Sequence, residues 1–113
     1  MEIINQTQLS ECMTGDAESD QDFIRSAIDE MVKRSHEMQD ALTHKDHEAW
    51  RLTAHRFKGV AATLGFTTLA DQFRNAEHHT NTDSERTAAL IRIHQLIDLT
   101  RAELKKIGML RPD

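Results

Sequence analysis

Hydrophobic side chains recur at the spacing of an α-helix along most of the chain. Between residues 20 and 42 they follow one another at intervals of three, four and seven positions, which places them on one face of a helix. The residues of this stripe are Ile24, Ile28, Met31, Met38 and Leu42. The pattern predicts a long amphipathic helix over residues 20–42 that buries this face against the rest of the protein.

Two more amphipathic stretches follow, separated by residues that begin and end helices. A helix is predicted over residues 46–64, with Asp46 as its N-cap and Gly65 as the glycine that ends it. The next helix is predicted over residues 67–79, with Thr67 or Thr68 as its cap. Its hydrophobic face consists of Leu69, Phe73 and Ala76.

A last long helix is predicted over residues 83–107. Thr82 with Glu85 three positions later forms the pattern of a capping box, and the hydrophobic stripe consists of Leu90, Ile93, Ile97, Thr100 and Leu104. A weaker helical segment lies near residues 8–13, within a polar front segment over residues 1–19 that we expect to be solvated. Because short connections make neighbouring helices antiparallel, the prediction is an all-α, up-down four-helix bundle with a possible short extra N-terminal helix, forming one domain over residues 1–113.

Charge and cysteine content narrow the classes of function. The net charge of −5 argues against nucleic acid as the main partner, although residues 51–74 carry four Lys or Arg side chains against one Asp. One cysteine excludes an internal disulfide. The first residues lack the pattern of a signal peptide, and no hydrophobic run is long enough to span a membrane. We therefore expect a cytoplasmic protein without membrane insertion.

His55 lies on the polar side of the second predicted helix. At about 100° per residue, the hydrophobic stripe is centred opposite this histidine, so the imidazole is expected to face solvent. Lys58 is expected to be an exposed cation one turn away, while Gly59 and Ala62 place no bulk beside the ring. A mid-helix glycine costs about 1 kcal/mol relative to alanine but leaves room for a partner. The stripe consists of Trp50, Thr53, Phe57, Val60, Ala61 and Leu64.

These residue types suit a phosphoryl acceptor. An ordinary imidazole has a pKa of about 6.5 and is a neutral nucleophile near pH 7. Once phosphorylated, it carries nearly two negative charges, which an ammonium group about 4 Å away stabilises by ~1 kcal/mol in water. Lys58 is therefore expected to tune the reaction without being indispensable. For a histidine taken alone, an incidental surface residue is the more common explanation.

The surroundings of His55 resemble the signature of the histidine-containing phosphotransfer (HPt) domain family. That signature is Ala-His-x-apolar-Lys-Gly, a run of small residues, a glycine ten positions after the histidine, a leucine four positions later, and Glu or Gln near the end of the next helix. Phe57 and Val60 depart mildly from it, and both point inward, so only packing details are affected. The matching residues are Ala54-His55-Arg56-Phe57-Lys58-Gly59-Val60-Ala61-Ala62-Thr63-Leu64-Gly65, Leu69 and Glu77.

The resemblance implies a phosphocarrier without autonomous kinase activity. His55 would accept a phosphoryl group on Nε2 from an aspartyl phosphate of a receiver domain and return it to another receiver. Lys58 would help to neutralise the phosphoryl oxygens, Gly59 would leave room for the receiver, and Glu77 would orient the imidazole. The partners would be receiver domains of response regulators and of a hybrid histidine kinase. The protein would need no cofactor of its own, since Mg²⁺ is expected on the receiver, and it would act as a monomer.

Further contacts with a receiver are expected on the same side of the molecule. Ala62 lies almost in line with His55, two turns further along the helix. Arg51, Arg56 and Arg74 are added as docking contacts from their charge and position.

Two alternatives remain open on the sequence. A helical adaptor could bind signalling partners without chemistry, although such a relative would be expected to have lost His55. A metal-binding bundle is suggested by seven histidines, including His44 and His47 near a helix start and the tandem His78 and His79. Neither pair lies on a hydrophobic, inward-facing stripe, so solvated histidines are the favoured interpretation.

Overall fold

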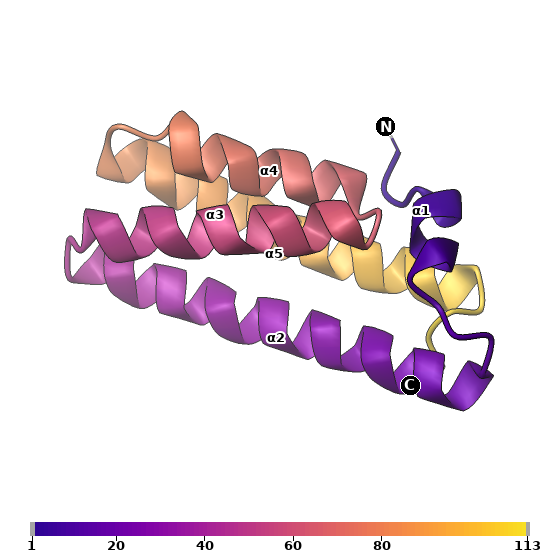
Figure 1. Cartoon of the computed structure of the whole chain (residues 1–113). Helices are drawn as coiled ribbons and strands as arrows, with labels where there is room; N and C mark the ends of the chain where they lie inside the picture. The colour runs from indigo at the N-terminus through magenta and orange to yellow at the C-terminus, as the bar shows by residue number, and fades with distance from the viewer. Residues whose placement is uncertain (1, 113) are drawn as a thin grey trace.

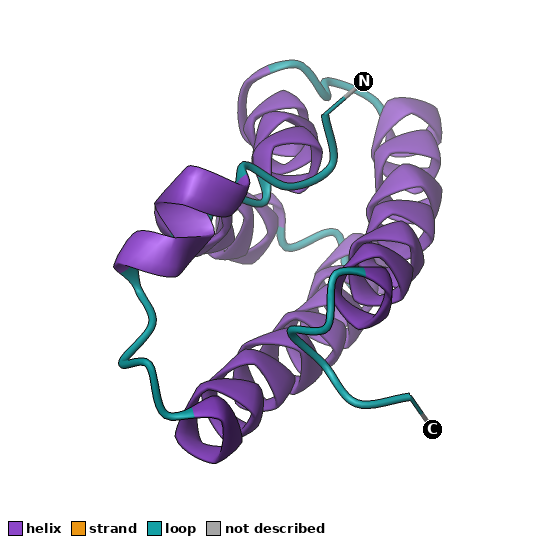
Figure 2. Cartoon of the chain, turned by 90° about the vertical axis from the view of Figure 1, so that its right-hand side faces the viewer, coloured by secondary structure: helices purple, strands orange, loops and turns teal. Residues whose placement is uncertain are grey.

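The computed structural model describes residues 2–112 as a bundle of helices (Figures 1 and 2). The helices are α1 (Gln6–Glu11), α2 (Ala17–Thr43), α3 (His47–Thr63), α4 (Thr67–His78) and α5 (Asp83–Lys106). Helices α2 to α5 run up and down along one axis, and α1 packs at the end where α3 turns into α4. The described part of the chain contains no strand. The predicted all-α bundle with a short N-terminal helix is confirmed.

The core lies where the hydrophobic stripes predict it. The stripe residues of α2, α4 and α5 are all buried, and the fully inaccessible ones include Ile24, Met31, Leu69, Ile93 and Leu104. The molecule measures 43 × 23 × 20 Å, and its long dimension matches the roughly 40 Å expected for a helix as long as α2. None of the described helices is long and apolar enough to cross a membrane.

Two helix starts follow the sequence prediction closely. The Asp46 carboxylate accepts a hydrogen bond from the Ala49 N–H at 3.0 Å and caps α3. At the start of α5, the Thr82 hydroxyl accepts from the Glu85 N–H at 3.1 Å, while the Glu85 carboxylate accepts from the Thr82 N–H at 3.0 Å. This is the reciprocal capping box that the sequence predicts.

The start of α2 corrects the prediction, because the helix begins at Ala17 and not at Asp20. Asp20 lies within the first turn of the helix and is buried. Its carboxylate accepts hydrogen bonds from the N–H and hydroxyl of Thr14, both at 2.8 Å, and from the Gly15 N–H at 3.1 Å. The backbone hydrogen bond from Thr14 is the main reason why the pKa of Asp20 lies below its ordinary value. The hydrogen bonds to this carboxylate therefore connect the front segment to α2.

The turn between α3 and α4 is built on Gly65. This residue has φ of +76°, so it ends α3 as predicted. The Asn5 N–H donates to its carbonyl at 2.7 Å, which docks α1 on the turn. Neither threonine caps α4: the N-cap is Phe66, fully buried, and the Thr67 hydroxyl donates to the Gly65 carbonyl at 3.1 Å. Burial of Phe66 fixes the chain direction here, so the helix begins without a side-chain cap.

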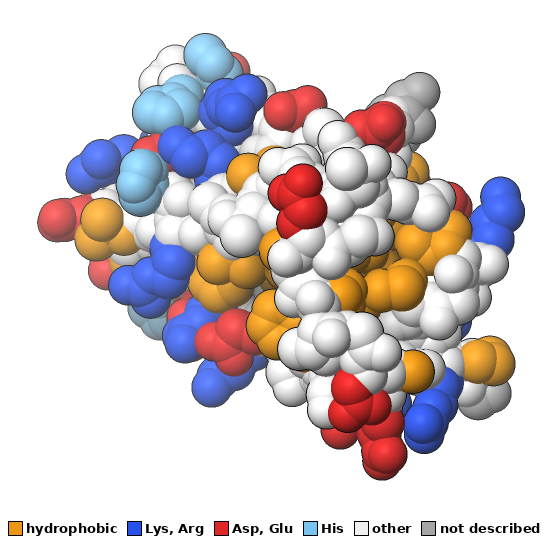
Figure 3. All heavy atoms as spheres, turned by 45° about the vertical axis from the view of Figure 1, so that its right-hand side comes forward, with side chains coloured by type: hydrophobic (Ala, Val, Ile, Leu, Met, Phe, Trp, Pro, Cys, Tyr) orange, Lys and Arg blue, Asp and Glu red, His pale blue; other side chains and the backbone are white. Residues whose placement is uncertain are grey.

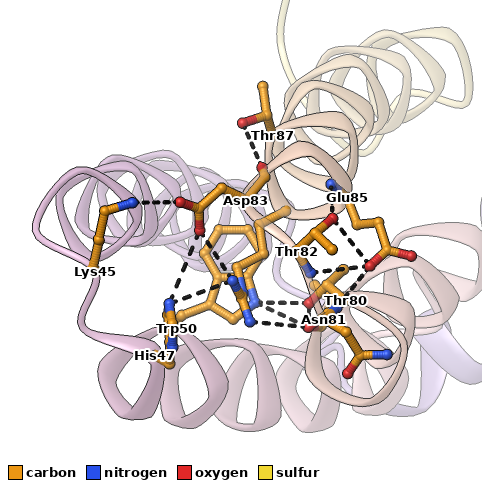
Figure 4. A network of polar contacts seen from close by, with 11 residues as sticks. Lys45, His47, Trp50, Thr80, Asn81, Thr82, Asp83, Glu85 and Thr87 are labelled. Atoms are coloured by element: carbon orange, nitrogen blue, oxygen red, sulfur yellow. Dashed lines mark hydrogen bonds and ion pairs between the residues drawn. The ribbon is translucent and has the colours of Figure 1, made fainter.

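A network of polar contacts lies at the end of the bundle away from α1 (Figure 4). Arg86 of α5 is buried and donates to the Asp83 carboxylate at 3.1 Å and to the Thr80 carbonyl at 3.3 Å. The Trp50 indole of α3 donates to the Ala76 carbonyl of α4 at 2.9 Å. These contacts fix the C-terminal turn of α4 against α3, and Glu77 lies within this turn.

Candidate functional site

His55 projects outward from the middle of α3. Its side chain is 63% exposed, whereas Ala54, Phe57 and Ala61 of the same helix are buried. This amphipathic division follows from the helical spacing of the hydrophobic residues. The expectation that the imidazole faces solvent is confirmed.

Glu77 reaches the imidazole from the last turn of α4. Its side chain is only 5% exposed, and its Oε2 lies 2.7 Å from Nδ1 of His55. An ionised carboxylate has acceptors only, so in the neutral imidazole the proton lies on Nδ1. The lone pair of Nε2 is then the free one. The contact between a buried carboxylate and an exposed ring thus selects the neutral tautomer that carries its proton on Nδ1 and its lone pair on Nε2.

Lys58 binds the same carboxylate. Its Nζ donates to Oε1 of Glu77 at 3.0 Å, and its side chain is 23% exposed. Lys58 is therefore less exposed than its place on the polar side of α3 predicts, because its Nζ binds the buried Glu77 carboxylate of α4. The cation lies beside the histidine without binding it.

The pKa of Glu77 lies below its ordinary value. Burial acts to raise this pKa, but the hydrogen bonds from Lys58 and His55, together with the charges of His55 and His78, lower it by more. The carboxylate is therefore ionised at neutral pH. Its negative charge lies beside the one imidazole nitrogen that keeps its proton.

His78 also contacts Glu77, and the sequence did not predict this contact. Its Nε2 lies 3.2 Å from Oε1 of Glu77, and its side chain is 53% exposed. The tandem histidines diverge on the helix as expected, and their ring centroids are 6.3 Å apart. Only the position of His78 directly after Glu77 could have signalled this contact, and adjacency alone does not show which side chain turns back.

The surface beside His55 is open on the side of Gly59. Gly59 and Ala62 are both exposed, and a Cβ atom added at Gly59 would meet nothing within 4 Å. Gly59 also lines a largely hydrophobic groove of about 500 Å³ between α3, α2 and the front segment. Phe23 of α2, 49% exposed, and Cys12 line it too. The sequence reasoning did not identify this groove, because its two walls are far apart along the chain.

The three predicted arginines occupy different surroundings. Arg51 and Glu77 both line a hollow of about 410 Å³, and Arg56 lines the hydrophobic groove. Arg74 of α4 is exposed and pairs with Asp71 at 3.4 Å. Figure 3 shows basic and histidine side chains gathered toward the end of the bundle distant from α1, with hydrophobic surface nearer to α1.

The other histidines do not assemble into a metal site. Among residues 2–112, no group of three or more His, Cys, Asp or Glu side chains is placed to hold a metal ion. The Nδ1 atom of His44 pairs with the Asp40 carbonyl of its own helix at 2.8 Å. His47 lies 3.9 Å from the Asp83 carboxylate, within the network of Figure 4.

Comparison with known proteins agrees with this geometry. No curated protein and no solved structure matches the chain significantly. The sequence model of the Hpt domain matches residues 22–104, a span that contains His55, Lys58 and Glu77 and most of the bundle. Domains of this family are phosphocarriers that interact with receiver domains in phosphorelays. On the strength of this match, the chain belongs to the Hpt domain family.

Proposed function

We propose that this protein carries a phosphoryl group on Nε2 of His55 between receiver domains. The observation that carries the proposal is the 2.7 Å contact between Nδ1 of His55 and the buried Glu77 carboxylate. This contact engages Nδ1 and leaves Nε2 available on a side chain that is 63% exposed. A receiver of a hybrid histidine kinase would supply the phosphoryl group, and the receiver of a response regulator would take it.

The reaction needs no proton to leave the ring. The Nε2 lone pair attacks phosphorus, the bond between phosphorus and the aspartyl oxygen breaks, and the receiver aspartate departs as a carboxylate. The imidazole keeps the proton on Nδ1 and therefore gains positive charge as the N–P bond forms. Glu77, already ionised and in contact with Nδ1, stabilises that charge. The second transfer reverses these steps onto another aspartate.

Lys58 supplies positive charge that stabilises the phosphoryl oxygens. Its ammonium group is held one turn from His55 by Glu77, close enough to reach the oxygens by rotation of its side chain. Mg²⁺ would be bound by carboxylates of the receiver. This chain would supply positioning and electrostatics, without nucleotide binding and without kinase activity of its own.

The receiver would dock over the open side of α3. Gly59 and Ala62 permit close approach to the imidazole, and the hydrophobic groove beside Gly59 offers apolar surface to the partner. Arg51 and Arg56 would contact acidic groups around the receiver's phosphorylation site, and Arg74 would contribute at the edge. Two receivers would use this surface in turn, so we expect the carrier to act as a monomer in the cytoplasm.

The test is transfer of a labelled phosphoryl group from phosphorylated receiver domains. The parent protein should acquire label that is labile in acid and stable in alkali, as expected for phosphohistidine, and His55→Gln should acquire none. His79→Gln is the matched control, because it removes an exposed histidine and should leave labelling unchanged. Equal labelling of His55→Gln and the parent would refute the proposal. Receiver binding without any labelling of the parent would favour the adaptor.

A further inference from the structure

We propose that His78 is a positioning residue that holds the Glu77 carboxylate while Lys58 moves onto the phosphoryl group. This inference rests on the proposed function and concerns the same site. It assigns a role to the third side chain at Glu77.

The three contacts to Glu77 are unevenly divided between its two oxygens. Oε2 accepts from Nδ1 of His55 at 2.7 Å. Oε1 accepts a hydrogen bond from Nζ of Lys58 at 3.0 Å, and it also lies 3.2 Å from Nε2 of His78, which forms an ion pair with it when that ring is protonated. Since the Glu77 side chain is only 5% exposed, water has little access to either oxygen. Each oxygen therefore depends on protein donors.

Transfer places two demands on Lys58. In the unphosphorylated protein its ammonium group neutralises Oε1 of Glu77. During transfer the new negative charge lies on the oxygens of the phosphoryl group bound to Nε2 of His55, on the side of the ring away from Nδ1. An ammonium group that moves toward this charge weakens its contact with Oε1. A buried carboxylate oxygen without a donor would then oppose the movement that catalysis requires.

His78 is placed to remove this conflict. It contacts the oxygen that Lys58 would leave, and its half-exposed side chain, on the last residue of α4, has room to shorten the contact. An imidazole donates from Nε2 as the imidazolium or as the neutral Nε2–H tautomer. His78 then stays in contact with Oε1 while Lys58 leaves it. No contact joins His79 to Glu77 among the described residues, so we assign this role to His78 alone.

A double-mutant cycle between His78 and Lys58 tests the exchange. Rates are measured with a phosphorylated receiver that labels the parent protein. His78→Ala should slow transfer about three- to tenfold, because Oε1 loses its remaining donor when Lys58 moves. Lys58→Ala should slow transfer by roughly tenfold. The double variant should be no slower than Lys58→Ala, since no cation is left to exchange.

Two further variants separate positioning from general structural damage. His78→Gln should restore most of the rate, because its side-chain N–H₂ reaches the region of imidazole Nε2. His79→Ala should transfer at the parent rate. The inference is overturned if the two single effects multiply, if His78→Ala transfers like the parent, or if His79→Ala is equally slow. Failure of the parent to accept label would instead overturn the proposed function itself, and this inference with it.

Discussion

Replacement of Glu77 by glutamine tests the chemistry at His55 most sensitively. The substitution keeps the size of the side chain but removes its charge. Both groups that contact Glu77 at 3.0 Å or less, Nδ1 of His55 and Nζ of Lys58, present hydrogens. A carboxylate offers each an acceptor, whereas an amide offers one oxygen and one N–H₂ group. If the amide oxygen faces His55, the contact with Lys58 is lost, and if the N–H₂ group faces His55, the ring can accept it only as the tautomer without a proton on Nδ1.

The size of the effect follows from these contacts. A hydrogen bond to a charged group contributes about 1.5–3 kcal/mol, which corresponds to roughly ten- to a hundredfold in rate. The imidazole is 63% exposed, so solvent screens part of the interaction and places the expectation near the lower end. We expect Glu77→Gln to slow phosphorylation of His55 about tenfold.

Two phosphoryl donors distinguish chemistry from docking. Phosphoramidate, a small donor, reports the reactivity of the imidazole, and a phosphorylated receiver reports reactivity and docking together. Glu77→Gln should be slow with both donors. Asp71→Asn is the matched control, because it removes one negative charge from the same helix at a side chain that is 66% exposed. A folded Glu77→Gln protein that reacts within about twofold of the parent would refute the role of Glu77.

Three further predictions concern the surroundings of the site. Gly59→Ala should raise the free energy of unfolding by up to about 1 kcal/mol, since the helix gains an alanine in open space. Gly59→Leu should react normally with phosphoramidate and slowly with a receiver, and normal rates with both donors would remove Gly59 from the docking surface. Gly65→Ala should lower the melting temperature by at least about 5 °C, because φ is +76° and a Cβ would lie 2.6 Å from the Asn5 carbonyl oxygen; an unchanged melting temperature would contradict the packing of α1 on this turn. The pKa values of Glu77 and Glu85 lie below their ordinary range, so the folded protein binds fewer protons than the unfolded chain. Its free energy of unfolding, measured with denaturant, should therefore fall as the pH drops below about 5 and these carboxylates become protonated, and Glu85→Gln should make this fall shallower.

The helical stripes were predictable because each depends on local spacing alone. A residue three or four positions from another faces the same side of any helix, so Ile24 and Ile93 had to be buried once their helices packed. The exposure of His55 followed from the same rule applied to the opposite face. Gly65 and the capping box at Thr82 were recognisable because their function lies in backbone geometry within a few residues.

Features that depend on packing between helices were not predictable in this way. The hydrogen bonds that Thr14 and Gly15 donate to Asp20 depend on how the front segment folds back onto α2, and no helical spacing predicts them. Lys58 is predicted to be an exposed cation, but the packing of α4 against α3 places Glu77 beside it. The role of Glu77 came from a family resemblance, because no spacing rule links residues 22 positions apart on different helices. No family motif points to His78, so its contact with Glu77 is visible only in the structure.

We propose that Nε2 of His55 is the reacting atom because Glu77 keeps the proton on Nδ1. Phosphorus and nitrogen NMR of ¹⁵N-labelled protein treated with phosphoramidate identifies the nitrogen that is phosphorylated. We expect a phosphorus–nitrogen coupling to Nε2 of His55, with the Nδ1 proton still present and hydrogen-bonded. Coupling to Nδ1, or to a nitrogen of any other histidine, would contradict it.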